Sequence, residues 1–513
     1  VYVPKTSLFV YNEEIKNDIY FGGNEMRVLF VNPPFKAEYG KFSREARSAM
    51  ITNSGVVYYP LWLLYAAGVT QEQGFDVDFL DAPAKQMTHQ QSIEWIKQKG
   101  ADYSLIVLDT STPSIYNDVR FGASLKDLFP RSFVALMGTH PTALPKETME
   151  LNDKIDGIAK GEADYIIRDL AIALRDGTPL SDVRGLVYRN KKEIVVNEEM
   201  PLITNVDEIP WAAKLIKQFL DPKDYFFAAA EYPEIQIFTG RGCPARCYFC
   251  VYPQTIHGHQ YRVRSAQNVA DEFEYIVNNF PDVKEVVIED DTFTINRNRT
   301  QDICKLLIGK GINKKIKWLC NARVNLDYDT MVLMKQAGCS LIIPGIESGS
   351  QELLNNMKKG TTIKQIEEYV KNAKKAGLLI HACYMVGNKG ETRETMEQTL
   401  KFAIKLDTDT AQFYTLHPYP GTEAYNWAVE AGYLKNDNFE NWIKEDGTHN
   451  CVINLDNISA KELVAFCDYA RKRYYLRPKY ILRKGVQSLK NKDELVRNVK
   501  GFVNIAPKLF RKS

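Results

Sequence analysis

The sequence lacks the long apolar segments that would place a protein in a membrane or direct its secretion. Its most apolar early stretch, VVYYPLWLLYAAGV, is 14 residues long, whereas a membrane-spanning helix needs about 20. The first residues, VYVPKTSLFVYNEEIKND, are acidic early and have no apolar core of the signal-peptide type. The nine cysteines are an odd number and mostly scattered, as is typical of a reducing compartment. We therefore expect a soluble, cytoplasmic protein.

The chain also lacks a strong overall charge. Its net charge is +2, so the composition gives no reason to expect a nucleic-acid partner. Residues 471–513 nevertheless hold fourteen Lys and Arg against two acidic residues, a net charge of +12 that leaves −10 on the remainder. Apolar residues alternate with these basic ones, which predicts helices with one apolar and one basic face. Such helices either pack on the protein with the basic side in water or lie on an anionic membrane surface.

No G-x-G-x-x-G fingerprint occurs in the first part of the chain, so a nicotinamide dinucleotide is not expected there. From MRVLFVNPPF onward, apolar strands alternate with helical stretches, which predicts a parallel sheet with right-handed crossovers. We assign residues 26–180 to a Rossmann-like domain whose ligand lies at the carboxyl ends of the strands. The small or polar residues expected at those ends are Asn32, Ser111, Thr112, Gly138, Thr139, His140, Gly161 and Glu162.

A second series of strands and helices follows a connector. Residues 181–232 contain a small hairpin, GLVYRNKKEIVVNEEMP, and several prolines. Residues 233–430 read as six strands with helices between them, which predicts a partial (β/α)6 barrel. Residues 431–513 are expected to form a helical, basic C-terminal region. The predicted fold class is therefore α/β throughout the two main domains.

Three cysteines lie in the loop after the first barrel strand, in the stretch GRGCPARCYFC. Barrel active sites lie at this end of the strands, and thiolates bind soft metals. Four cysteines saturate a [4Fe–4S] cluster, whereas Cys243, Cys247 and Cys250 leave one iron open to a small molecule. A zinc site completed by His257 or His259 is the alternative. The other six cysteines are isolated, as core cysteines are.

The spacing C-x3-C-x-F-C, with Phe249 before the third cysteine, closely resembles the signature of the radical S-adenosylmethionine (SAM) superfamily. The resemblance implies a [4Fe–4S] cluster on the three thiolates, with SAM chelating the fourth iron. Reductive cleavage of SAM then yields a 5′-deoxyadenosyl radical, which abstracts hydrogen from unreactive carbon. The protein binds and orients these cofactors and excludes water.

The same resemblance implies a set of SAM contacts at the strand ends. The turn EDDTF takes the place of the family's Gly-Gly-Glu turn and lacks its glycines. The implied contacts are Asp290 or Asp291 for the amino group, Arg323 for the carboxylate, Glu347 and Ser348 for the ribose, and Gly387 for the approach to adenine. For Arg323 and Glu347, the alternative is an ion pair inside the barrel.

The D-D-x-F turn, together with VNPP, GTHPTALP and KGEAD, resembles the subclass that carries an N-terminal cobalamin-binding domain. The likeness covers residues 26–430. The D-x-H-x-x-G motif that supplies a cobalt-ligating histidine in some cobalamin enzymes is absent. The resemblance therefore implies cobalamin held without a protein imidazole, with His140 as a loop residue rather than a cobalt ligand.

This resemblance implies a cobalamin-dependent methyltransferase acting on an unactivated carbon of a lipid, natural-product or sugar intermediate. The alternative is ring contraction, oxidative cyclisation or carbon–carbon coupling on the same scaffold. A non-catalytic electron carrier would not need the SAM contacts, and methylthiolating relatives have cysteines before the triad, whereas none precedes Cys243 here. The expected partners are an electron donor such as flavodoxin or ferredoxin and, through the basic tail, the inner face of the membrane. The candidates for lining the substrate site, each of which packing also explains, are Tyr384, Tyr414, His417 and Tyr419.

Overall fold

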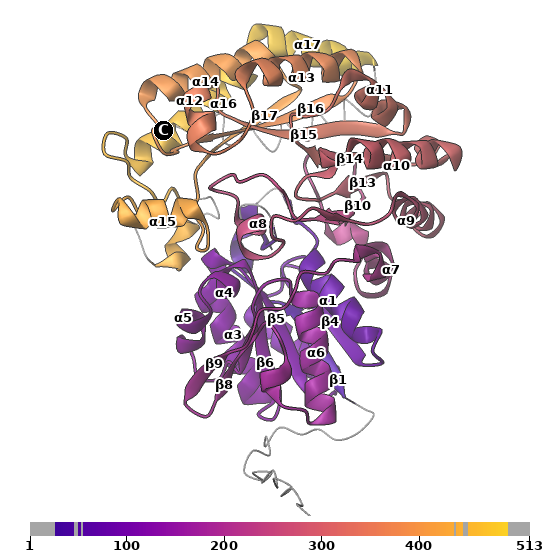
Figure 1. Ribbon diagram of the computed structural model, residues 1–513, viewed down its shortest axis with the longest axis vertical. Coiled ribbons are helices and arrows are strands. Elements are labelled where there is room, and N and C mark those ends of the chain that lie inside the picture. The colour runs from indigo at the N-terminus through magenta and orange to yellow at the C-terminus, as the bar shows by residue number, and fades with distance from the viewer. Residues whose placement is uncertain (1–25, 46–49, 53–54, 435–437, 445–449, 491–513) are drawn as a thin grey trace, which may run out of the picture.

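The computed structural model describes residues 26–45, 50–52, 55–434, 438–444 and 450–490. An N-terminal α/β domain lies at one end of the molecule and the barrel at the other, with the last two helices on the outer side of the barrel (Figure 1). Within the described ranges, none of the helices combines the length and hydropathy that crossing a bilayer requires.

The N-terminal sheet has seven strands in the order β4-β1-β5-β6-β7-β8-β9. The strands from β4 to β7 are parallel, which confirms the Rossmann-like prediction. Because β1 lies between β4 and β5, the strand order reverses there, and a ligand crevice opens at the carboxyl ends of such strands. The bounds are β1 Arg27–Asn32, β4 Asp76–Asp81, β5 Leu105–Thr110, β6 Phe133–Gly138, β7 Gly157–Ala159, β8 Leu186–Asn190 and β9 Glu193–Val196.

The hairpin of β8 and β9 belongs to this sheet, although the sequence placed it in the connector. Strand β8 pairs antiparallel with β7, for example Ile158 with Val187. The sheet therefore runs past residue 180, the boundary predicted from the sequence. The hairpin covers the backbone groups of β7, which would otherwise form an exposed sheet edge. Composition alone does not reveal this pairing, because β7 is only three residues long.

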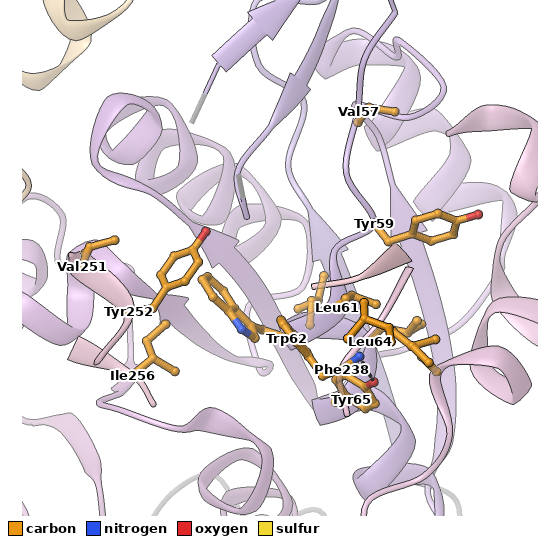
Figure 2. Close-up of a cluster of buried hydrophobic side chains, with 14 of the residues drawn as sticks. Val57, Tyr59, Leu61, Trp62, Leu64, Tyr65, Phe238, Val251, Tyr252 and Ile256 are labelled. Carbon is orange, nitrogen blue, oxygen red and sulfur yellow. Dashed lines mark hydrogen bonds between the residues drawn. The ribbon is translucent and has the colours of Figure 1, made fainter. Parts of the chain in front are cut away.

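Helices cover both faces of the sheet, and one of them has an unusual environment. The helices are α1 Leu61–Gln71, α2 His89–Gln98, α3 Ile115–Leu128, α4 Thr139–Ala143, α5 Pro145–Glu150 and α6 Ala163–Asp176. In α1 every residue from Leu61 to Thr70 is buried, because the helix lies between the sheet and the barrel. Its Tyr65 hydroxyl accepts a hydrogen bond from the Phe238 amide at 3.1 Å, across the domain boundary (Figure 2). The apolar stretch near the start of the chain is therefore a domain interface.

The barrel sheet contains six parallel strands in the order β10-β13-β14-β15-β16-β17, as the sequence predicts. Its strands are β10 Glu234–Ile237, β13 Glu285–Ile288, β14 Lys317–Ala322, β15 Cys339–Glu347, β16 Leu379–Val386 and β17 Thr410–Thr415. The accompanying helices are α7 Ala212–Phe219, α8 Val251–Thr255, α9 Ala266–Asn279, α10 Arg297–Gly309, α11 Tyr328–Gln336, α12 Gln351–Asn356, α13 Ile363–Lys375, α14 Arg393–Leu406 and α15 Glu423–Glu430. A short antiparallel pair, β11 Gly240–Arg241 and β12 Arg262–Val263, flanks the cysteine loop.

The C-terminal region contains a 3-10 turn, η8 (Phe439–Trp442), and two helices, α16 (Ala460–Tyr475) and α17 (Pro478–Lys490). Two basic side chains of α17 face the barrel: Lys484 lies 3.3 Å from Asp409, and Arg483 lies 3.3 Å from Asp407. The apolar side chains of Ile481, Leu482 and Leu489 are instead 55%, 71% and 90% exposed. In a helical cap with its basic side in water, the apolar side chains would pack on the protein. Here the apolar side chains are exposed and the basic ones face the barrel. The rest of the basic tail, 491–513, lies outside the described residues.

Candidate functional site

The cysteine loop follows β10 and is held by its own hydrogen bonds. Cys243 and Cys247 are buried and Cys250 is half-buried. The Gln254 amide donates to the carbonyl oxygens of Cys247, Tyr248 and Cys250 at 3.3, 3.2 and 2.8 Å. The Cys243 amide donates to the carbonyl of Gly258, and the Cys243 carbonyl faces a ring nitrogen of His259 at 3.0 Å. The three thiols are therefore presented by a loop with a defined shape.

The donor set fits a [4Fe–4S] cluster better than zinc. Both ring nitrogens of His257 are occupied, since one accepts from the Trp62 indole at 3.1 Å and the other donates to Asp291 at 2.8 Å. In the part of the chain that the structure describes, no three Cys, His, Asp or Glu side chains converge on a single ion. A zinc ion needs such convergence. In a cluster each thiolate binds a different iron, so the three sulfurs stay apart.

Two cations lie beside the cysteine loop. The Arg323 guanidinium is 3.9 Å from the Cys247 sulfur and donates to the carbonyl of Lys359 at 2.6 Å. The buried ammonium of Lys359 donates to the Glu347 carboxylate at 2.8 Å. Arg323 and Glu347 are therefore joined through Lys359 rather than paired directly. Lys359 was not predicted from the sequence, because it lies after α12, in a loop that carries no strand-end motif.

Glu347 ends β15 with a backbone φ of 66°, a left-handed conformation that costs a non-glycine residue free energy. Its carboxylate also accepts a hydrogen bond from the Tyr414 hydroxyl at 3.1 Å. Ser348 is committed to its own turn, since its hydroxyl accepts from the Ser350 amide and lies 3.1 Å from the Thr399 hydroxyl. Of the two residues predicted at the ribose, Ser348 uses its hydroxyl to stabilise its own turn, whereas the Glu347 carboxylate is held by Lys359 and Tyr414.

The turn after β13 supports the cysteine loop. Asp290 is fully buried and accepts hydrogen bonds from the Thr239 amide and hydroxyl, both at 2.6 Å, and from the Gly240 amide at 3.0 Å. Asp291 accepts from His257 and, at 2.9 Å, from the Gly242 amide. These bonds show that Asp290 and Asp291 hold the backbone of the loop; the contact of one of them with the SAM amino group stays a prediction.

The loop after β16 is tied to the cysteine loop through Tyr248, whose hydroxyl accepts from the Lys389 amide at 3.1 Å. Gly387 has a φ of 90°, and its amide donates to Glu391 at 3.0 Å. A Cβ atom on Gly387 would lie 3.1 Å from Leu463 of α16. The glycine therefore also permits close packing of the C-terminal region, a reason that the sequence did not show.

The other predicted lining residues divide into two kinds. Tyr384 is fully buried and stacks on Phe413 with ring centroids 5.1 Å apart, so it packs in the core. Tyr419 contacts the Trp442 ring of η8, with centroids 5.6 Å apart, and His417 lies beside Tyr419. Tyr419 and His417 therefore join an aromatic cluster with the C-terminal region.

The structure brings most of the predicted N-terminal residues to one edge of the sheet. Thr112 and His140 meet there with 3.2 Å between hydroxyl and ring nitrogen, and the Ser111 hydroxyl is 3.0 Å from that of Ser114. Burial lowers the pKa of His140 to about 3, so its ring is neutral. The Phe439 ring of η8 packs edge-on against His140, with 4.8 Å between centroids. Thr139 and the strand-end glycines Gly138 and Gly161 lie at the same edge.

Two of the predicted residues have other partners. The Asn32 side chain donates to Asp81 at 2.8 Å and accepts from Arg44 at 2.6 Å, which ties β1 to its neighbours. Glu162 accepts from Arg241 at 2.9 Å and from Arg262 at 2.8 Å, and both arginines belong to the barrel. Burial alone raises the pKa of Glu162, but the two arginine charges outweigh it and leave the pKa below its ordinary value. Both side chains therefore link elements of the protein, and their contact with a cofactor stays a prediction.

An unpartnered carboxyl group marks the crevice between β1 and β5. Asp109, near the end of β5, is fully buried, and among the described residues neither of its carboxyl oxygens has a hydrogen-bond partner. Burial raises its pKa to about 7, against the opposing charge of Arg44. Beside it, Gly138 has a φ of 118°, and a Cβ there would lie 2.1 Å from the Thr110 carbonyl oxygen. A buried polar group without a partner fits a ligand rich in amides, such as cobalamin.

Comparison with known proteins agrees with these two sites. Residues 237–403 match the family model of the radical SAM superfamily, and residues 47–171 match that of the B12 binding domain. An uncharacterized methyltransferase of Pyrococcus horikoshii is 31% identical over 459 residues, which cover 89% of this chain and 94% of that protein. The chain belongs to the radical SAM superfamily, in the branch with a B12-binding domain.

More distant relatives share the same architecture. The anaerobic magnesium-protoporphyrin IX monomethyl ester cyclase of Cereibacter sphaeroides is 28% identical, covering 78% of this chain and 63% of that protein. The cobalamin-dependent SAM radical enzyme OxsB, solved with aqua-cobalamin and SAM, superposes with a TM-score of 0.69 at 15% identity, over 95% of this chain and 74% of OxsB. The methyltransferase TsrM of Kitasatospora setae, solved with cobalamin and a [4Fe–4S] cluster, has a TM-score of 0.62 at 18% identity, over 80% of this chain and 76% of TsrM.

The chain is therefore a radical SAM enzyme, and its cofactors are a [4Fe–4S] cluster, SAM and cobalamin. A small molecule is the class of substrate that fits such an enzyme.

Proposed function

We propose that the protein transfers a methyl group to an unactivated carbon atom of a small-molecule substrate. The observation that carries this proposal is that the strand ends of the N-terminal sheet lie next to the strand ends of the barrel. A small cavity of about 10 Å³, room for one water molecule, is lined by Gly138 and Gly161 from the N-terminal sheet and by Arg241 and His257 from the barrel. Helix α4, which follows β6, also contacts α8, which follows the cysteines. A group held at one edge is thereby brought close to a group held at the other.

The cofactors supply the chemistry: the cluster with SAM supplies a 5′-deoxyadenosyl radical, and cobalamin supplies the methyl group. Cys243, Cys247 and Cys250 would hold the cluster. Arg323 and Lys359 lie where two positive charges would attract the carboxylate of SAM, and each keeps its charge through contacts with the protein. The burial of Cys243, Cys247 and Lys359 would help to exclude water from the radical.

We assign the remaining contacts on the same geometry. Glu347, held by Lys359 and Tyr414, would accept hydrogen bonds from the ribose hydroxyls, and Phe249 would flank the cluster below the Lys359 ammonium, 5.9 Å from its ring. On the other edge, the proposed cobalamin contacts are Asp109, Ser111, Thr112, Gly138, Thr139, His140 and Gly161. His140, neutral and bonded to Thr112, would lie beside the corrin rather than ligate cobalt.

The experiment that tests methyl transfer is anaerobic. The protein is reconstituted with iron, sulfide and cobalamin, and SAM with a strong reductant is followed by mass spectrometry. Formation of both 5′-deoxyadenosine and S-adenosylhomocysteine would support methyl transfer, because SAM then serves as radical source and as methyl donor. Formation of 5′-deoxyadenosine alone, with cobalamin bound, would contradict it.

A second candidate is a radical reaction without methyl transfer, such as a ring closure. It is favoured by the likeness to the monomethyl ester cyclase of Cereibacter sphaeroides, at 28% identity. The relatives that match also include a bacteriochlorophyllide d C-12(1)-methyltransferase of Chlorobaculum tepidum, at 24% identity. A tetrapyrrole, a lipid, or a natural-product or sugar intermediate remains our proposed substrate class. The ratio of the two SAM products separates the two candidates.

We further propose that the C-terminal region contacts a membrane surface and that a flavodoxin or ferredoxin supplies the electron. The exposed apolar side chains of Leu482 and Leu489 on α17, next to a strongly basic tail, support the membrane contact. Flotation with anionic vesicles tests it, comparing the double change Leu482→Ser and Leu489→Ser with Leu151→Ser, a leucine 41% exposed on the N-terminal domain. Equal flotation of the two variants would contradict the proposal.

A further inference from the structure

The arginine two positions before the first cysteine is held by the N-terminal domain. Arg241 is 2% exposed and donates to Glu162 at 2.9 Å and to both oxygens of Asp164 at 2.7 and 2.9 Å. The two carboxylates lie at the start of α6, whereas Arg241 lies in β11 of the barrel. The contact with Asp164 is bidentate, which fixes the orientation of the guanidinium as well as its position.

A second contact reaches the same loop from α1. The Trp62 indole donates to one nitrogen of His257, and because an indole is only a donor, that nitrogen must be the acceptor. The other nitrogen therefore carries the proton and donates to Asp291, which in turn accepts from the Gly242 amide. The Trp62 ring lies beside Tyr252 and Ile256, in the apolar cluster between the domains (Figure 2).

The two contacts converge on adjacent residues. Arg241 is held by its side chain and Gly242 by its amide, and Cys243 follows directly. Gly242 has a φ of 82°, and a Cβ there would lie 2.1 Å from the Gln260 carbonyl oxygen, so this backbone has little room to adjust. A displacement of α1 or α6 must therefore reach the Cys243 backbone.

We infer that the N-terminal domain positions Cys243, and with it the cluster, through Arg241 and His257. Stability alone does not account for the contact, because a buried ion pair contributes little net stability over apolar side chains of similar volume. The contact sets the separation of the two cofactor sites, on which the transfer of a group between them depends. The inference rests on the proposed cluster ligands, Cys243, Cys247 and Cys250.

The test uses the full chain reconstituted with cluster and cobalamin, carrying Asp164→Asn or Trp62→Phe. Each change removes one link from the N-terminal side; Asp164→Asn keeps the side-chain volume, and Trp62→Phe keeps an aromatic ring but also shortens it at a buried position. The matched control is Glu272→Gln, which breaks an equally buried ion pair with Arg264 that lies within the barrel. The readouts are iron content, the electron paramagnetic resonance (EPR) spectrum of the reduced cluster with and without SAM, and product formed per SAM cleaved.

We expect both variants to retain their iron but to show an altered EPR spectrum. Product per SAM cleaved should fall roughly tenfold, since a misplacement of about 1 Å can cost about a hundredfold in rate. Glu272→Gln should match the unaltered protein in both readouts. If Asp164→Asn loses its fold, Trp62→Phe decides the matter, because it breaks no ion pair; it removes the hydrogen bond to His257 and part of the ring packing on Tyr252.

Spectra and coupling in both variants equal to those of Glu272→Gln would overturn the inference. Cys243→Ala, measured alongside, separates this result from a failure of the ligand assignment. If Cys243→Ala loses iron while Asp164→Asn and Trp62→Phe are normal, only the positioning role fails. If Cys243→Ala keeps a full cluster, the assignment of the three cysteines as ligands is wrong, and the positioning role falls with it.

Discussion

The cysteine loop and the crevice of the N-terminal sheet both lie at strand ends, where we propose that the cofactors bind, yet they are built differently. In the cysteine loop the backbone is held by Gln254, Asp290 and Asp291, and the shape is complete. At the crevice, Asp109 is buried without a hydrogen-bond partner among the described residues. A site for a cluster must hold three sulfurs in fixed positions beforehand, whereas a site for a large organic cofactor can leave polar groups for the ligand to satisfy.

Removing a cluster ligand should have the largest effect of the changes considered. Cys243→Ala, Cys247→Ala or Cys250→Ala should each abolish turnover, because three thiolates are the minimum that leaves one iron for SAM. Iron content and 5′-deoxyadenosine formation are the measurements. Cys304→Ala, at a buried cysteine of α10, should change neither. Full activity in any of the three variants would refute the ligand assignment.

The rigidity of the cysteine loop is tested by Gly242→Ala. The positive φ and the carbonyl oxygen 2.1 Å from a Cβ should make the change destabilising by about 3 kcal/mol. Gly309→Ala is the control, because a Cβ at the end of α10 meets nothing within 4 Å and should stabilise by about 0.5 kcal/mol. Urea denaturation measures both. Equal stability of the two variants would show that the loop adapts.

The unpartnered carboxyl of the crevice should make stability depend on pH. The pKa of Asp109 is raised from 3.8 to about 7, so between these values the folded chain binds more protons than the unfolded chain. Its free energy of unfolding therefore falls as pH rises from about 4 to 7, by up to about 1.4 kcal/mol per pH unit. Asp109→Asn cannot titrate and should make this slope shallower, while Asp81 and Glu391, whose pKa values burial raises to about 6 and about 7, keep contributing to it.

Unfolding of the cobalamin-free protein at several pH values measures this slope. The exposed Asp102→Asn should leave the slope as it is, since that carboxylate lies at the surface in a pair with Arg131. Added cobalamin should change the slope of the unaltered protein but not that of Asp109→Asn. A slope in Asp109→Asn equal to that of the unaltered protein would contradict this assignment.

The smallest effect is expected where the C-terminal region meets the N-terminal domain at the surface. Arg120 and Glu440 pair at 2.6 Å, but their side chains are 63% and 36% exposed. Arg120→Ala should therefore cost about 0.5 kcal/mol or less, because solvent screens such pairs. Thermal unfolding measures it, and a loss above about 2 kcal/mol would mean that η8 contributes much more to the domain contact than its exposed charges indicate.

Much of the architecture followed from the sequence, because alternating apolar strands and helices predict parallel sheets and strand-end sites. The cysteine spacing identified the family, and Arg323 and Glu347 lie near the cysteine loop as expected. Lys359 was not predicted, since it belongs to no motif. The β8–β9 hairpin was misplaced because strand pairing depends on contacts distant in the chain.

The sequence by itself determined the ligand chemistry, since three thiols at this spacing and the order of the strand-end residues are local properties. Only the tertiary structure decided which polar residues serve the cofactors and which serve the fold. Glu162, Asn32 and Asp290 carry side chains suited to either task. Their roles are set by the partners that folding brings within about 3 Å, because hydrogen bonds form only over that range.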